Sequence, residues 1–464
     1  MDKYILFFIG LILTALPSWG QAEETVEIKI SIETEQQCAI DAVSAVMPPL
    51  KFNKRMLISY TLDDDTVTAY GNIFCIINQN WVEQGKPFHH LNGETTETGF
   101  MPVKTLGYTD GAGIEKRFAF GVAIWSQAGN KWVPNFMSTR ENPGGSHDPY
   151  LKWYEIPLLL DFGSTVYAHD TELAPFLPNA TEEELKAAYK NADLIAQGWV
   201  KDLEITRQKL GGRGFITLME PNGNYTYCEA KKKFAPLKVV CNQGAGGKSV
   251  TLRPLSMTPD FENTVFERRF FRNIPIAEEF AYLQSQYNNP DPIWYHLATH
   301  RADKPIMDLL AMINDTYGKD GSDTIWFATV DEYYQYAQMR KNTIIGKSVE
   351  GNKIVFTLAI PRFPDNHYQD FSLIISGIGK PDKAKISVSD SANSFSYAAI
   401  DGDKLLINAG FNPELIQRVE KYVQIYKSNP TNQNKCNALY FINQLRPELK
   451  QAWEKRMALE SDAE

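Results

Sequence analysis

Three consecutive aspartates, Asp63, Asp64 and Asp65, stand directly after an apolar run that ends at Leu62. Adjacent carboxylates repel one another, so such a group is normally held by a cation or lies beside a metal ion. A hard or borderline metal ion takes one carboxylate oxygen together with imidazole nitrogens, which leaves a second carboxylate to act as a base towards water. A solvated acidic turn is the simpler interpretation, and the pattern by itself favours it.

The segments around this acidic run indicate how it is positioned. Four further short apolar runs end in ionisable residues, at His169-Asp170, Glu220, His300 and Asp331-Glu332. Helical segments lie between them, and one of these begins with a capping box at 181–184 and is expected to continue to Leu210. This alternation predicts a parallel sheet, open or closed into a barrel. Active sites of such folds gather at the carboxyl ends of the strands, where these ionisable residues stand.

The order of these segments resembles that of the polysaccharide deacetylase (NodB-homology) family of metal-dependent carbohydrate esterases, exported bacterial type. The first motif of that family is Thr-Phe-Asp-Asp-Gly, and this chain has Thr61-Leu62-Asp63-Asp64-Asp65. Later segments are similar to further family motifs and follow in the family's order: 161–169, 220–225, 294–300 and 323–340. The resemblance covers about residues 51–341 and implies an α/β fold, a distorted (β/α) barrel of the NodB-homology type.

Roles for four residues follow from the resemblance. It implies that Asp63 is the general base that activates water and that His300 is the general acid that protonates the leaving group. It also implies that Asp64 and His169 bind a divalent metal ion, expected to be zinc. Such an ion polarises the acetyl carbonyl and stabilises the oxyanion that forms from it.

A carbohydrate substrate suggests a role for exposed aromatic rings, on which sugar rings stack. Aromatic residues make up 12% of the chain, and several gather in the stretch 100–154. Packing in the core accounts for most of them. Trp125 and Trp132 in this stretch, and Tyr225 in the third motif, are candidate substrate-binding residues.

The chain departs from the family pattern at three positions. The family's His-x-x-x-His motif needs a second imidazole at position 173, and Leu173 cannot bind a metal ion. Asp65 replaces a glycine, and Glu220 or a close neighbour stands where many members have an arginine that pairs with the base. Three residues could replace the missing ligand: His147, Asp170 and Glu172. Otherwise the metal site is weakened and the activity is lost.

Other residue types that bind metals give weaker signals. His296 precedes His300 by four residues, a spacing that would suggest a zinc pair on a helix, but 293–295 has the character of a strand. The chain has five cysteines and no Cys-x-x-Cys, so a thiolate zinc site is disfavoured. Cys228 and Cys241 flank a short basic segment and could form a disulfide, although sequence alone cannot establish pairing.

Composition and the N-terminus limit the partners and the location. The chain has 464 residues and a net charge of −9, which disfavours a basic nucleic-acid binder. Lys3, an apolar stretch over 4–16, and small residues at positions 18 and 20 predict a signal peptide, removed after Gly20. The residue directly after that site is Gln21 and not a cysteine, so a lipoprotein anchor is disfavoured. No later segment is apolar enough to cross a membrane, and we therefore expect a secreted or periplasmic protein.

These observations predict five parts: a signal peptide (1–20), an N-terminal strand and lead-in (21–50), the deacetylase-like barrel (51–341), a small antiparallel β module (342–411) and a C-terminal helical extension (412–464). The predicted function is metal-dependent removal of acetyl groups from a carbohydrate. The alternative is a catalytically inactive relative that binds a glycan or a partner. A glycosidase with paired carboxylates has little support beyond Asp63 and Glu220.

Overall fold

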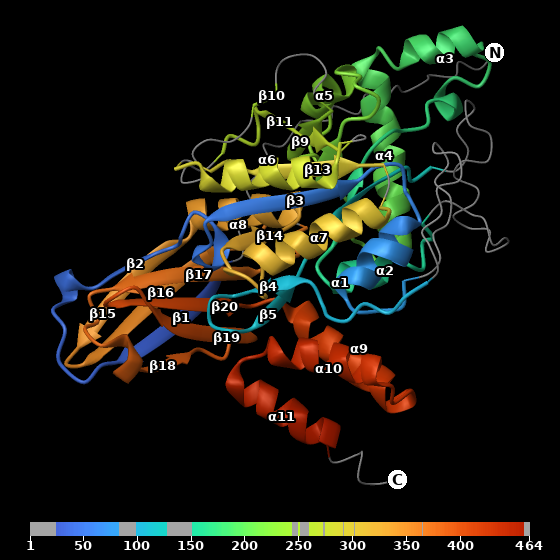
Figure 1. Ribbon diagram of the computed structural model, residues 1–464. Coiled ribbons are helices and arrows are strands. Elements are labelled where there is room, and N and C mark those ends of the chain that lie inside the picture. The colour runs from blue at the N-terminus through green and yellow to red at the C-terminus, as the bar shows by residue number, and fades with distance from the viewer. Residues whose placement is uncertain are drawn as a thin grey trace, which may run out of the picture.

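The computed structural model describes residues 25–82, 99–127, 151–243, 249–250, 259–271, 274–290, 292–300, 302–363 and 365–458 (Figure 1). The predicted signal peptide, Trp132 and His147 lie outside these residues. None of the helices in the described part of the chain has the length and apolar character needed to cross a membrane.

A parallel sheet forms the centre of the molecule. Its hydrogen-bonded order is β10-β11-β9-β8-β7-β6-β3-β13-β12, and β14 pairs with the first half of β3. The strands are β3 (Met56–Leu62), β6 (Gly121–Ile124), β7 (Thr165–Ala168), β8 (Thr217–Met219), β9 (Val239–Asn242), β10 (Ser249–Val250), β11 (Val265–Glu267), β12 (Arg269–Phe270), β13 (Tyr295–Thr299) and β14 (Ile325–Phe327). All seven residues of β3 are buried, as expected of a strand covered on both faces. The predicted distorted (β/α) barrel is confirmed.

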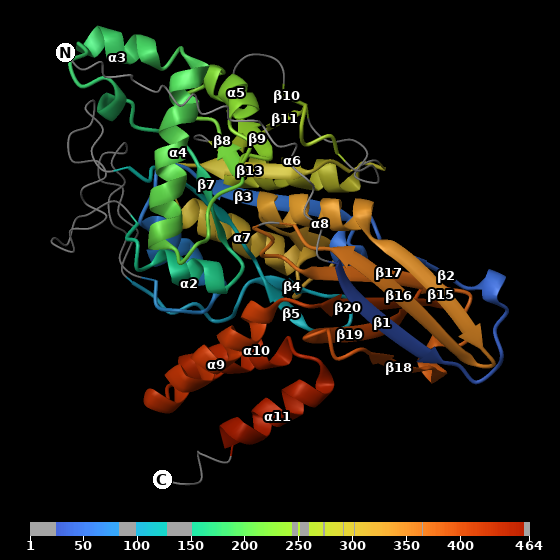
Figure 2. The same cartoon turned by 180° about the vertical axis from the view of Figure 1, so that it is seen from behind.

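Helices cover the outer side of this sheet, and Figure 2, which is viewed from behind, shows α4 on the side that faces the viewer. They are α1 (Cys75–Ile77), α2 (Ile156–Asp161), α3 (Glu182–Ala188), α4 (Ala192–Lys209), α5 (Thr226–Ala230), α6 (Ile276–Asn288), α7 (Lys304–Tyr317) and α8 (Val330–Asn342). The capping box at Thr181 is confirmed. The single helix predicted from it is wrong, because Asn191 caps a second helix through the backbone N–H groups of Asp193 and Leu194.

The β module contains two four-stranded antiparallel sheets, and each takes one strand from the N-terminal part of the chain. The first has the order β15 (Ile344–Glu350), β16 (Lys353–Pro361), β1 (Thr25–Glu33) and β18 (Lys385–Val388). The second has the order β19 (Ser394–Ile400), β20 (Lys404–Gly410), β17 (Asp370–Ser376) and β2 (Ser44–Val46). All nine residues of β1 pair with β16, so the N-terminal strand belongs to the module structurally.

The predicted helical extension consists of α9 (Pro413–Ser428), α10 (Asn432–Asn443) and α11 (Pro447–Ala458). It lies beneath the barrel in Figure 1, next to the short hairpin of β4 (Gly107–Thr109) and β5 (Glu115–Arg117). Phe162 of the barrel contacts the rings of Tyr422, Tyr440 and Phe441, with centroids 4.9–5.7 Å apart. This aromatic contact attaches the extension to the barrel.

No disulfide joins any two of the five cysteines, all of which lie in the described residues. The pairing considered for Cys228 and Cys241 is therefore not present. Alternate residues of a strand face opposite sides of the sheet. Cys241 packs in the main core, whereas Cys228 on α5 packs with Val240 in a separate cluster beneath α4.

Candidate active site

Asp63 follows β3 and is fully buried beside a guanidinium group. Its backbone N–H donates to the carbonyl of Thr299, which continues the pairing of β3 with β13. Nη1 of Arg268 lies 2.6 Å from Oδ1 of Asp63, and both side chains are 0% exposed. Asp63 is thus held in place by a charge-assisted hydrogen bond from Arg268.

Arg268 also fixes the loops around Asp63. It lies between β11 and β12, and its Nη2 donates to the backbone carbonyl of Glu220 while its Nε donates to that of Asn242. No pattern in the sequence singles out Arg268 as a site residue. The guanidinium partner of Asp63 does not come from the third motif, where the family has its arginine, but from a segment 205 residues away from Asp63.

Asp64 lies between two imidazoles. Oδ1 of Asp64 is 3.2 Å from Nε2 of His169, which follows β7, and Oδ2 is 3.7 Å from Nε2 of His300, which follows β13. Burial disfavours the charged form of His169, but Asp63 and Asp64 outweigh it and raise the pKa of His169 to about 9. Burial lowers the pKa of His300 despite the same two carboxylates. The structure therefore brings together all four residues to which the resemblance assigns catalytic or metal-binding roles.

The orientation of the His169 ring is set by its second nitrogen. Nδ1 lies 2.7 Å from the carbonyl oxygen of Met219, at the end of β8. A carbonyl only accepts hydrogen bonds, so Nδ1 carries a proton and Nε2 is turned towards Asp64. Histidines that bind metal ions are commonly oriented in this way.

Asp65 has a structural role at the base of the site. It adopts φ of 53°, and Asp64 adopts φ of 61°, a left-handed conformation that is uncommon for residues other than glycine. The carboxylate of Asp65 accepts the backbone N–H of Trp125, at 3.0 and 3.2 Å from its two oxygens. Asp65 thus keeps the turn that glycine allows and joins it to the loop after β6. This contact places the Trp125 ring 6.5 Å from the His169 ring, centroid to centroid.

Glu220, at the end of β8, is fully buried close to Asp63 and Arg268. Oε2 accepts the backbone N–H of Gln243 at 3.0 Å, and Oε1 has no hydrogen-bond partner within the described residues. Burial raises the pKa of Glu220, against the hydrogen bond from Gln243 and the charge of Arg268. The side-chain amide of Gln243 also lies 3.4 Å from Oδ2 of Asp63, so one residue contacts both carboxyl groups.

The turn after β7 holds the two described candidates for a substitute ligand. Asp170 accepts hydrogen bonds from the backbone of Thr171 and from the hydroxyl of Tyr227, and Glu172 accepts the backbone N–H of Ala174. These bonds hold both carboxyl groups within the turn and its neighbouring helix. Leu173 is 0% exposed and packs in the cluster beneath α4, on the side of β7 away from the main core.

Two further residues from the sequence analysis lie apart from the pair of His169 and Asp64. His296 is a buried core residue that stacks on Trp294 and hydrogen-bonds Thr61 at 2.7 Å. Burial lowers its pKa well below the usual value. Because His296 lies on the extended strand β13, four residues separate it from His300 by roughly 13 Å along the chain, so the two do not form the zinc pair that a helix would allow. Tyr225 stands before α5 and packs against the cluster beneath α4.

The donors around Asp64 suit a divalent metal ion in kind but are too few in number. A carboxylate and an oriented imidazole are common ligands of zinc, and a catalytic zinc ion takes three protein ligands. Within the described ranges, no group of three or more His, Cys, Asp or Glu side chains could hold a metal ion. His147, the remaining candidate for a third ligand, lies outside those ranges.

Comparison with known proteins identifies one family. A family model described as "Putative polysaccharide deacetylase" matches residues 27–458, which include the β module and most of the helical extension as well as the barrel. No curated protein matches the chain.

Proposed function

Because the chain belongs to this polysaccharide deacetylase family, we propose that it removes acetyl groups from a carbohydrate by metal-dependent hydrolysis. The observation that carries the proposal is the convergence of Asp63, Asp64, His169 and His300 at the carboxyl ends of β3, β7 and β13. Strand ends are where catalytic groups of (β/α) barrels gather.

Asp63 is the proposed general base. Arg268 occupies Oδ1 and keeps the carboxylate in place, while Oδ2 has only the long contact to the amide of Gln243 within the described residues. A fixed carboxylate can take a proton from water as that water attacks the acetyl carbonyl, which contributes about 10²–10⁴-fold to such reactions.

Asp64 and His169 are the proposed metal ligands, and the ion they hold would polarise the acetyl carbonyl and activate water. The carbonyl of Met219 keeps Nε2 of His169 directed at Asp64. His300 is the proposed general acid. Its side chain is 29% exposed, so it borders the solvent side of the site, where a leaving amine or alcohol would receive a proton.

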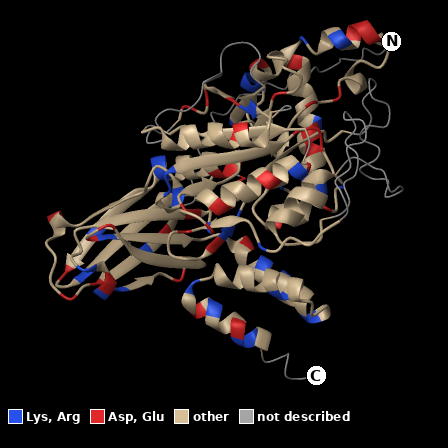
Figure 3. Cartoon of the chain, in the orientation of Figure 1, with Lys and Arg blue, Asp and Glu red and all other residues tan. Residues whose placement is uncertain are grey.

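Supporting features are consistent with a secreted enzyme that acts on a neutral glycan. Figure 3 shows Lys and Arg interspersed with Asp and Glu along the described elements. Trp125, held by Asp65 close to His169, is the described aromatic residue best placed to contact a sugar ring. The leader-like residues 1–20 support export.

Acetate release from acetylated oligosaccharides, measured with added zinc or cobalt and with chelator, tests the proposal. We expect release by the wild-type protein, a loss of at least about 100-fold in kcat for Asp63→Asn, and an unchanged rate for Asp401→Asn, an exposed carboxylate of the β module. Metal content after dialysis gives a second readout, and Asp64→Ala should lower it. No release with any metal, together with no difference between wild type and Asp63→Asn, would contradict the proposal.

One observation favours the second candidate, an inactive relative that binds a glycan. Leu173 is packed into the core, and no three-ligand metal site exists within the described residues. This candidate predicts sub-stoichiometric metal after dialysis, and glycan binding that survives Asp64→Ala. Stoichiometric metal in the wild type would exclude it.

A further inference from the structure

A cavity lies where the barrel, the β module and the helical extension meet; we call it the junction cavity. Its walls include Gly163 and Arg213, which precede β7 and β8, Asp370 at the start of β17, and Arg418 of α9. It is therefore at the opposite end of the barrel strands from Asp63. Its volume is about 110 Å³, whereas one water needs only about 10–15 Å³ by this measure. The junction cavity has room for a small ion.

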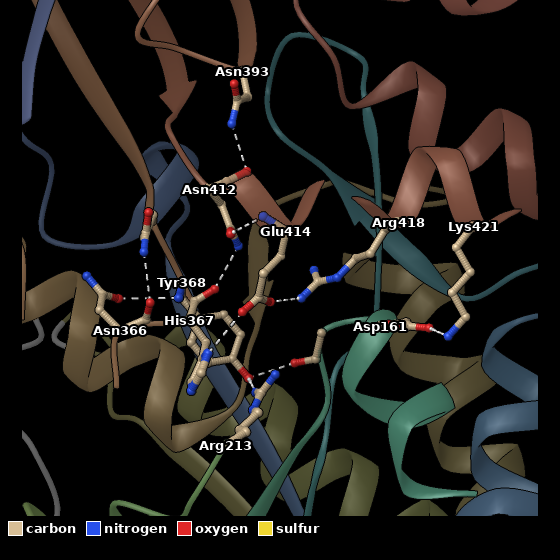
Figure 4. A network of polar contacts seen from close by, with 12 residues as sticks. Asp161, Arg213, Asn366, His367, Tyr368, Asn393, Asn412, Glu414, Arg418 and Lys421 are labelled. Carbon is tan, nitrogen blue, oxygen red and sulfur yellow. Dashed lines mark hydrogen bonds and ion pairs between the residues drawn. The ribbon is translucent and has the colours of Figure 1, made fainter. Parts of the chain in front are cut away.

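The walls of the junction cavity carry more positive than negative charge. The cationic side chains are Lys116, Arg117, Arg213 and Arg418, and the carboxylates are those of Asp161, Glu332 and Asp370. Two of the three carboxylates are neutralised by lysines outside the walls: Asp161 by Lys421 at 2.5 Å and Glu332 by Lys51 at 2.6 Å. Glu414, next to the cavity, already binds Arg418 and His367 (Figure 4).

Arg213 forms no close ion pair in the described part of the chain, although the charges of Asp331 and Glu414 act on it. It is 9% exposed, its Nε has no hydrogen-bond partner there, and its Nη2 reaches only the Tyr368 hydroxyl at 3.5 Å. Arg117, 4% exposed, donates from Nη1 to the amide oxygens of Asn78 and Asn437, and its Nε is likewise unsatisfied. Nε2 of His367 also has no partner within the described residues, but Nδ1 of the same ring donates to Glu414, so Nε2 is an acceptor in the singly protonated ring.

Unsatisfied donors of this kind are unfavourable. A buried polar group without a hydrogen bond costs about 1–3 kcal/mol, and more when it is charged. Here two such nitrogens, Nε of Arg213 and Nε of Arg117, belong to residues that line one cavity, and they come from the segment before β8 and from β5. An anion with several oxygens can accept from donors in different directions, as guanidinium groups do with phosphate.

We propose that the junction cavity is a binding site for a small tetrahedral oxyanion of the phosphate class, with Arg213 as its principal ligand and Arg117 as a further donor. The site is independent of the proposed hydrolysis. Because residues of the barrel, the β module and α9 line the cavity, the bound anion stabilises the junction between these parts.

The test is thermal unfolding and isothermal titration of the full chain with inorganic phosphate, sodium chloride serving as the matched ionic-strength reference. We expect phosphate to raise the Tm, and Arg213→Met to weaken phosphate affinity by at least tenfold. Arg213→Lys keeps the positive charge but loses the planar, forked guanidinium group. Its affinity for phosphate should lie between that of the wild type and that of Arg213→Met. Arg456→Met removes one positive charge from exposed α11 and should leave the affinity unchanged.

Each result has a defined meaning. Saturable binding that depends on Arg213 and not on Arg456 supports the site. Equal Tm shifts for all variants, or no shift beyond that of chloride, would overturn it. Sulfate and acetate distinguish the ligand class: stabilisation by sulfate as well supports a tetrahedral oxyanion, whereas stabilisation by acetate alone overturns that assignment. If Arg213→Met does not fold, Arg213→Lys carries the same comparison.

Discussion

Replacing Arg268 with methionine should lower the free energy of unfolding by about 3–5 kcal/mol, because it leaves the buried charge of Asp63 without its partner. The two side chains are 0% exposed and their closest atoms are 2.6 Å apart, so solvent cannot replace the guanidinium. Two backbone carbonyls, of Glu220 and Asn242, lose a donor in the same variant. Urea unfolding followed by tryptophan fluorescence measures the loss.

A double-mutant cycle separates the charge from the other contacts of Arg268. Asp63→Asn removes the buried charge, so the double variant should recover at least about 2 kcal/mol relative to the sum of the two single changes. Arg207→Met is the matched control, because Arg207 forms an exposed ion pair with Asp365 and should cost less than about 1 kcal/mol. Additive effects in the cycle, or an Arg268→Met cost no greater than that of Arg207→Met, would refute the reasoning.

Two further predictions concern the parts of the molecule that support the site. Burial raises the pKa of Asp331 to about 6, against the hydroxyls of Thr217 and Thr165, so folding favours its protonated form. Its contribution to stability is complete below pH 3.8 and is lost as pH rises through about 6. The stability of the wild type relative to Asp331→Asn should therefore fall by about 2 kcal/mol between pH 4 and 7 in urea unfolding, and a constant difference would count against it. Phe162→Ala should lower the free energy of unfolding by about 3–5 kcal/mol and speed proteolysis within 413–458, because the contact with the extension is lost. Phe176→Ala is the control, because its ring is 39% exposed, and it should have neither effect. Equal protease resistance of the two variants would contradict the prediction.

The residues that the sequence predicts best are those that follow a buried strand directly. Asp63, Asp64, His169 and His300 each stand where an apolar run gives way to polar residues, and parallel strands bring their carboxyl ends to one edge. The chemistry of these positions could therefore be predicted without knowing how the strands are ordered. The strand register that brings Asp64 within 3.2 Å of His169 could not be predicted from these local patterns.

Arg268 and the N-terminal strands illustrate what the sequence does not reveal. Arg268 lies between strands of three and two residues, too short for any periodic pattern, and its partner is 205 residues away. β1 shows the alternation of a half-buried strand, but its partner β16 is separated from it by the entire barrel. Local pattern predicts that such elements exist, whereas their pairing depends on the completed fold.

Position 173 differs from the family pattern in its surroundings as well as in its side chain, because the neighbouring residues pack around a leucine. Leu173 packs with Trp199 in the cluster beneath α4, and the turn that precedes it is held by hydrogen bonds to Asp170 and Glu172. A histidine placed there would exchange an apolar core contact for a buried polar ring. This packing favours a third ligand from another segment over the reversal of one substitution.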